Sequence, residues 1–98
     1  MNKEIIYNRI KSLIFNAIEL TNEAQDDDIR LNKDINEIIK GDNSKLDSVG
    51  LVNFLLNTEE VLAGDLLECP NLFKFIENTN KDLSLNDIIN KITDENIS

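Results

Sequence analysis

The sequence predicts an all-α protein. In three separate segments, apolar residues recur at intervals of three and four, which is the spacing of one buried face of a helix. Turn-forming residues stand between the segments, in the run Gly-Asp-Asn-Ser at 41–44 and at the single proline, Pro70. No pair of short alternating segments indicates paired strands. We therefore expect three or four helices in a single domain over residues 1–98.

The first helix is expected over residues 3–20, where one apolar stripe follows the helical period. The stripe consists of Ile6, Ile10, Leu13, Ile14 and Ala17. A long loop over residues 21–47 is expected to follow it, and such loops are usually functional, disordered or occupied by a short helix. Within the loop, Ile35, Ile38 and Ile39 are expected to form a helical turn that places apolar side chains on the core.

Three further helices are expected after the loop. The second covers residues 48–62, and a short third helix covers residues 70–78, with Pro70 at its first position, where proline is favoured. The fourth covers residues 84–93, because Ser84 and Asp87 have the spacing of a capping box. Its expected buried face consists of Leu85, Ile88, Ile89 and Ile92.

The charge balance narrows the classes of partner. The chain has 19 acidic and 10 basic residues and a net charge of −9, which argues against nucleic acids and anionic membrane surfaces. A protein with a basic patch is a more suitable partner for so acidic a chain.

The longest uncharged run, residues 48–58, is shorter than the ~20 residues of a membrane span, and the N-terminal sequence lacks the apolar core of a signal peptide. We therefore expect a cytoplasmic protein.

The chain also lacks the side chains of common catalytic sites. Cys69 is the only cysteine and there is no histidine, which excludes an internal disulfide, the usual zinc ligand sets and histidine-assisted nucleophiles. We expect Cys69 to be a small apolar filler and the protein not to be an enzyme. Asp26, Asp28 and Glu37 match positions of a calcium-loop template, but Arg30 and Leu31 stand where that template needs a ligand and a glycine.

The second helix is expected to have two apolar faces. One consists of Leu51, Phe54, Leu55 and Leu62 together with Thr58, and the opposite one consists of Val49, Val52 and Leu56, beside the acidic Glu59 and Glu60. A helix on the surface of a small protein needs only one apolar face. The second face is therefore either a docking surface with an acidic rim or a face covered by the loop isoleucines.

The segment Lys45–Leu51, with sequence KLDSVGL, joins the loop to this helix. Asp47 or Ser48 can cap the helix by accepting a hydrogen bond from a free N–H of its first turn. The wider sequence LDSVGLVNFLLNTEEVL resembles the family of acyl carrier proteins and peptidyl carrier proteins, in which an Asp-Ser motif opens the second helix. The resemblance covers most of the chain and implies a four-helix bundle of the acyl-carrier-protein type.

The resemblance also implies a function. Ser48 would carry a 4′-phosphopantetheine arm beside Asp47. A phosphopantetheinyl transferase that uses Mg²⁺ would add the arm from coenzyme A. The thiol of the arm would hold an acyl or aminoacyl group as a thioester. Val49, Val52 and Leu56, with Asp47, Glu59 and Glu60, would dock on basic patches of loading and transferring enzymes.

Two features qualify this expectation. Gly50 and Asn53 stand where the fatty-acid-synthesis members often have acids, which favours a carrier in a specialised biosynthetic pathway. The alternative is a helical adaptor, or a degenerate carrier, that uses the same apolar face for protein binding without an arm.

Overall fold

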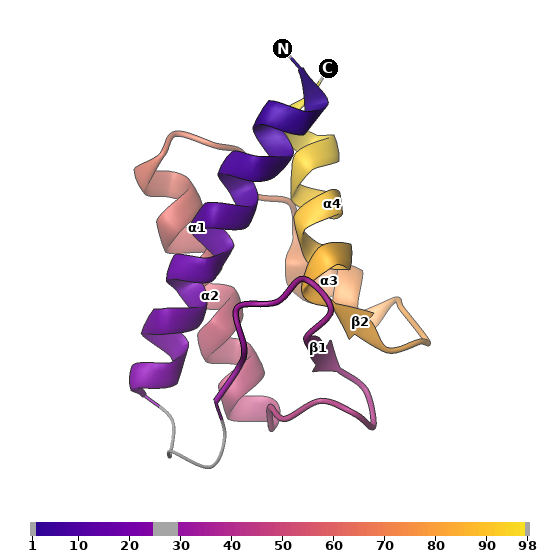
Figure 1. Ribbon diagram of the computed structural model, residues 1–98. Helices are drawn as coiled ribbons and strands as arrows, with labels where there is room; N and C mark the ends of the chain where they lie inside the picture. Colours follow the sequence, from indigo (N-terminus) through magenta and orange to yellow (C-terminus); the bar gives the residue numbers. More distant parts are fainter. Residues whose placement is uncertain (1, 25–29, 98) are drawn as a thin grey trace.

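The protein consists mainly of helices. A computed structural model describes residues 2–24 and 30–97, and within these residues it contains four helices and two strands (Figure 1). The helices are α1 (Lys3–Glu23), α2 (Ser48–Gly64), α3 (Leu72–Glu77) and α4 (Leu85–Asn96), and the strands are β1 (Ile38–Lys40) and β2 (Leu83–Ser84). The expectation of a helical chain with four helices is confirmed, but the expectation that it has no strand pair is wrong.

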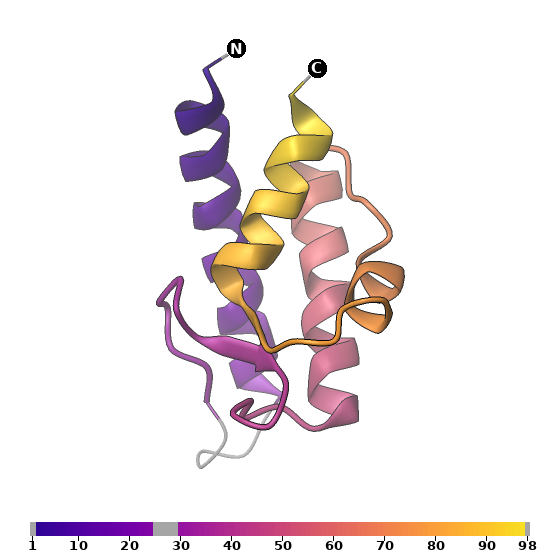
Figure 2. The same cartoon turned by 90° about the vertical axis from the view of Figure 1, so that its right-hand side faces the viewer.

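The three longer helices lie side by side (Figures 1 and 2). α1 packs against both α2 and α4 and runs in the opposite direction to them. The short α3 lies between α2 and α4 in the chain. Because α1 and α4 are antiparallel, the beginning of α1 and the end of α4 lie at the same end of the molecule (Figure 1). The start of α2 lies at the opposite end.

A single apolar core joins these elements. On α1, Ile6, Ile10, Ile14 and Ile18 are buried at intervals of four, together with Ala17. The predicted stripe of α1 is therefore confirmed, although Leu13 is only half-buried and Ile18 had not been included. The predicted buried face of α4 is also confirmed; it consists of Leu85, Ile88, Ile89 and Ile92.

The end of α1 and the start of α3 differ from the predicted positions. α1 continues to Glu23 instead of ending at residue 20, and Thr21 in its last turn is buried, with its hydroxyl donating to the carbonyl of Ala17 at 2.8 Å. α3 begins at Leu72 rather than Pro70, because Asn71 is its N-cap and accepts from the N–H of Lys74 at 3.0 Å.

The later helices are also longer or shorter than expected. α2 extends to Gly64 instead of residue 62, whereas α3 ends at Glu77, one residue early. α4 begins after Ser84, and the predicted capping box of Ser84 and Asp87 is confirmed, but the helix continues to Asn96 rather than 93.

The two strands replace the helical turn that was expected in the loop. β1 and β2 are antiparallel, with Ile38 opposite Ser84 and Lys40 opposite Leu83. Ile39 is almost fully buried, so the loop does place an isoleucine in the core, but from a strand. Three isoleucines within five residues fit either conformation, and β-branched side chains suit a strand once a distant partner segment is present.

Side-chain hydrogen bonds fasten the connection between α1 and α2. The amide of Asn22 accepts from the N–H of Leu31 at 2.8 Å and donates to the carbonyl of Leu31 at 3.0 Å. The ammonium group of Lys40 donates to the carbonyls of Ile76 and Thr79, at 2.7 and 2.6 Å. These hydrogen bonds hold the connection to α1 and to the end of α3.

Candidate functional site at the start and outer face of α2

The start of α2 is fixed by Asp47, which is its N-cap. Its Oδ1 accepts a hydrogen bond from the N–H of Gly50 at 2.7 Å, and its backbone is extended. Its carbonyl accepts from the N–H of Leu51 at 2.9 Å, which closes the first turn. Of the two residues that were expected to be able to cap this helix, Asp47 does so and Ser48 does not.

Ser48 is the first residue of α2 and is exposed. Its hydroxyl makes no hydrogen bond to any residue that the structure describes, and the same holds for the backbone N–H groups of Ser48 and Val49. Such free N–H groups and the helix dipole give the start of a helix a partial positive charge. A negatively charged group attached to Ser48 would lie at this positive end of α2.

The remainder of α2 has one buried and one exposed apolar face. Phe54, Leu55, Thr58 and Leu62 are buried, and Leu51 is half-buried, as predicted for the core side. On the other side, the exposed fractions are 69% for Val49, 41% for Val52 and 50% for Leu56. The loop isoleucines do not cover these three side chains: Ile39 is buried in the core and the three remain exposed. We call Val49, Val52 and Leu56 the outer strip.

Acidic residues accompany the outer strip. Glu59 and Glu60 are exposed in the last part of α2, and neither is ion-paired with any residue described. Asp47 is exposed at the other end of the strip. The structure therefore brings all the predicted site residues onto one helix and its cap. Their apolar and acidic side chains could meet a partner that offers apolar contacts and cations.

No protein-family model, curated protein or solved structure matches this chain. Within the described residues, no helix is long and apolar enough to cross a membrane. The assignment of a function therefore rests on the chemistry of the site and on the resemblance of its motif.

Of the residues that match the calcium-loop template, Glu37 has structural partners. The carboxylate of Glu37 accepts from the N–H of Asn32 at 2.6 Å and lies 3.5 Å from the ammonium group of Lys45. Asp26 and Asp28, which completed the calcium template, lie outside the described residues. Among residues 2–24 and 30–97, no group of three or more potential ligand side chains could hold a metal ion.

Cys69 is half-buried and packs against the core. Its Sγ lies 3.5 Å from the carbonyl of Pro70. Burial, and to a lesser extent the negative charge of Glu59, raise the pKa of the Cys69 thiol to about 11. A thiol with so high a pKa is a poor nucleophile at neutral pH, as the prediction of an apolar filler requires.

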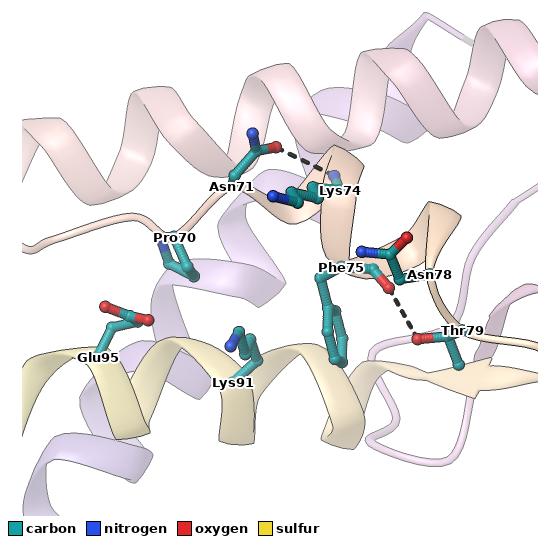
Figure 3. Close-up of a pocket in the computed structure, with 8 residues that line it drawn as sticks. All are labelled: Pro70, Asn71, Lys74, Phe75, Asn78, Thr79, Lys91 and Glu95. Atoms are coloured by element: carbon teal, nitrogen blue, oxygen red, sulfur yellow. Dashed lines mark hydrogen bonds between the residues drawn. The ribbon is translucent and has the colours of Figure 1, made fainter.

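Two hollows that the sequence did not indicate lie away from this site. One is a cleft between α3 and α4 (Figure 3). The other, of about 320 Å³, is lined by Ile5, Ile6 and Leu67 and by the ion pair of Arg9 with Asp65, whose atoms are 2.6 Å apart. Both are formed by residues far apart in the chain, so no local motif could have predicted them.

Proposed function

We propose that the protein is an acyl or aminoacyl carrier protein whose 4′-phosphopantetheine arm is attached to Ser48. The observation that carries the proposal is the division of roles at the start of α2. Asp47 caps the helix, and the hydroxyl of Ser48 is exposed and makes no hydrogen bond to the described residues. A serine that served only as a cap would have its oxygen occupied by a backbone N–H of the first turn.

The residues around Ser48 fit a phosphodiester. The free N–H groups of Ser48 and Val49 are donors for phosphate oxygens, and the dipole of α2 favours a negative charge there. Asp47 adds a like charge nearby, but both positions are exposed, where solvent screens the repulsion. When attached, the arm would supply a thiol that holds the cargo as a thioester. The hydroxyl of Ser48 itself has no histidine to activate it, so a transferase must install the arm.

The outer strip would then be the surface that partner enzymes recognise. Three exposed apolar side chains lie along the same helix as Ser48, with Glu59 and Glu60 near its end. Exposed apolar groups of this kind gain free energy when a partner covers them, and unpaired carboxylates steer cationic surfaces towards them. The helical arrangement would accordingly be a variant of the acyl-carrier-protein bundle with an added strand pair.

Intact-protein mass spectrometry tests the attachment. The chain is incubated with coenzyme A, Mg²⁺ and a broad-specificity phosphopantetheinyl transferase, and Ser48→Ala is treated in the same way. We expect the wild type to gain one phosphopantetheine group and the variant to gain none. An unchanged mass of the wild type, in the presence of a second carrier that the same transferase does modify, would contradict the proposal.

The exposed outer strip also favours a second candidate, a helical adaptor without an arm. The two functions differ only in whether Ser48 carries an arm, so the same mass measurement separates them.

A matched pair of variants tests whether the transferase recognises the outer strip of the carrier. Leu56→Asp, at 50% exposure, should slow transfer of the arm at limiting protein concentration. Ile5→Asp, at 63% exposure in the first turn of α1, should not, because α1 starts at the opposite end of the molecule from the start of α2 (Figure 1). Equal rates for the two variants would exclude the strip from recognition by the transferase.

A further inference from the structure

A cleft runs between α3 and α4 in a part of the molecule that the proposed carrier site does not use (Figure 3). It has a volume of about 650 Å³, and its walls come from α3, α4 and the residues on either side of α3. None of its lining residues belongs to α2. Small-molecule sites typically have volumes of roughly 300–1,000 Å³, so the cleft is large enough for a ligand of several rings or groups.

Two lysines line the cleft, Lys74 from α3 and Lys91 from α4 (Figure 3). Four other basic residues of the described chain are paired with carboxylates: Lys3 with Asp94, Arg9 with Asp65, Lys33 with Glu19 and Lys45 with Glu37. Neither Lys74 nor Lys91 has such a partner within 4.0 Å among the described residues. Both ammonium groups therefore keep their N–H donors available for an anion from outside.

An aromatic ring stands beside these charges. The ammonium group of Lys91 lies 5.6 Å from the centroid of the Phe75 ring, within the range of a cation–π contact. Phe75 is half-buried, packs against the core and lines the cleft. A flat group of a ligand could pack against this ring while a charged group meets the lysines.

The local charge of the cleft is opposite to that of the whole chain. Among the described residues, its only lining carboxylate is Glu95, which lies at the end near Pro70, so two cations and one anion line the cleft. The chain as a whole has a net charge of −9. At physiological ionic strength, charges farther away than about 8 Å are largely screened, so the net charge of the whole chain does not by itself exclude an anion from this cleft.

We propose that this cleft binds an aromatic phosphate monoester, with the phosphate between the ammonium groups of Lys74 and Lys91 and the ring against Phe75. A phosphate monoester carries a charge of about −1.5 to −2 at pH 7, which matches two ammonium groups better than a singly charged carboxylate does. Lysine binds phosphate as a compact point charge, and two lysines on facing helices can share one group. The side-chain amide of Asn78, which has no hydrogen-bond partner among the described residues, offers a further donor in the same cleft.

Phenyl phosphate, inorganic phosphate and phenol, added separately to the ¹⁵N-labelled full chain at physiological ionic strength, test the proposal by NMR. We expect phenyl phosphate to shift amide signals of α3 and α4 in a saturable manner. Inorganic phosphate lacks the ring and phenol lacks the charge, so each should bind at least about tenfold more weakly, which corresponds to about 1.4 kcal/mol. Absence of saturable shifts with phenyl phosphate, or saturable shifts confined to other parts of the chain, would overturn the proposal.

Variants test whether Lys74 and Lys91 themselves bind the phosphate, or whether any loss of a positive charge weakens binding. Lys74→Gln and Lys91→Gln should each weaken phenyl phosphate by about tenfold, equivalent to about 1.4 kcal/mol. Lys81→Gln removes an exposed lysine outside the cleft that has no ion pair with the described residues, and it should leave binding unchanged. Equal losses in all three variants would show a non-specific charge effect and overturn the site. Ser48→Ala should bind like the wild type, because this proposal does not depend on the carrier function.

Discussion

Asp47 accepts a hydrogen bond from the N–H of Gly50 at 2.7 Å and thereby caps α2. The consequence concerns the residue that follows Asp47: the hydroxyl of Ser48 is not needed to cap the helix. Adjacent residues in the same motif thus have separate roles, with one stabilising the helix and the next offering a free hydroxyl. These roles can be separated by mutation, because a loss of the cap lowers stability and a loss of the hydroxyl should not.

Replacement of Asp47 tests the cap. Asp47→Ala should lower the free energy of unfolding by about 1 kcal/mol, because an N–H of the first turn loses its acceptor. Asp47→Asn keeps an oxygen at the same position and should stay close to the wild type. Ser48→Ala should change stability by less than about 0.5 kcal/mol, since the hydroxyl makes no hydrogen bond to the described residues. Urea unfolding measures all three, and a larger loss in Ser48→Ala than in Asp47→Ala would reverse the assignment of the cap.

Gly41 follows β1 and has a φ of +121°, which side-chain-bearing residues rarely adopt. A Cβ at this position would also collide with the carboxylate of Asp82 and lie 3.1 Å from its Cα. Gly41→Ala should therefore lower the free energy of unfolding by about 1–3 kcal/mol.

Gly64, the last residue of α2, is the matched control for Gly41. A Cβ there would meet nothing within 4 Å, and no left-handed φ is required. Gly64→Ala should be neutral or stabilising by up to about 1 kcal/mol, because alanine has the higher helix propensity. Thermal unfolding of both variants decides the point: if they lose stability equally, the close approach of Gly41 to Asp82 does not constrain the turn.

The two hydrogen bonds between Asn22 and Leu31 fasten the long connection after α1. Asn22→Ala should cost about 1–3 kcal/mol, since two hydrogen bonds of about 0.5–1.5 kcal/mol each are lost. The amide proton of Leu31 should then exchange with solvent faster than in the wild type. Asn36→Ala, in the same connection and exposed, is the control, because its side chain makes no hydrogen bond to the described residues. Unchanged exchange at Leu31 in Asn22→Ala would contradict the fastening role.

Local sequence patterns predicted the helices because they depend on neighbours three and four residues apart. The stripe of α1, the capping box at Ser84 and the cap at Asp47 all belong to this class. The strand pair was missed because Ile38 finds its partner, Ser84, far along the chain, and three isoleucines alone do not specify a conformation. Tertiary contact, rather than local propensity, decides such a short segment.

Thr58 illustrates a polar residue whose burial the sequence did indicate but did not explain. It is fully buried, and its hydroxyl donates to the carbonyl of Phe54 at 2.8 Å, within the same helix. Buried Thr21 and Thr93 use the same arrangement, each donating to the carbonyl four residues earlier. A threonine can therefore occupy a core position of a helix without a partner from another element, because it satisfies its own hydroxyl.

The candidate site was predictable for the same reason as the helices, because its residues lie on one turn-and-helix segment. The cleft of Lys74 and Lys91 was not, because its two walls become neighbours only when α3 folds back beside α4. Neither lysine is distinguished in the sequence from the other basic residues. Only the folded structure shows that neither is ion-paired with a carboxylate of residues 2–24 or 30–97.

The raised pKa of Cys69 predicts how fast its thiol reacts in the protein with and without an arm. With a pKa of about 11 instead of 9.0, the folded thiol should contain roughly a hundredfold less thiolate at pH 8 than an ordinary one, and iodoacetamide should label it slowly. Labelling in urea should be fast, since unfolding removes the burial. The folded state retains the thiol proton to higher pH than the unfolded state does. The stability that this raised pKa contributes is therefore fully present below pH 9.0 and is lost as the pH rises to about 11.

The thiol of a phosphopantetheine arm on Ser48 would be exposed, so the protein treated with the transferase should show one fast and one slow thiol at pH 8. Untreated wild type should show the slow thiol alone, and fast labelling of Cys69 in that folded sample would contradict its burial.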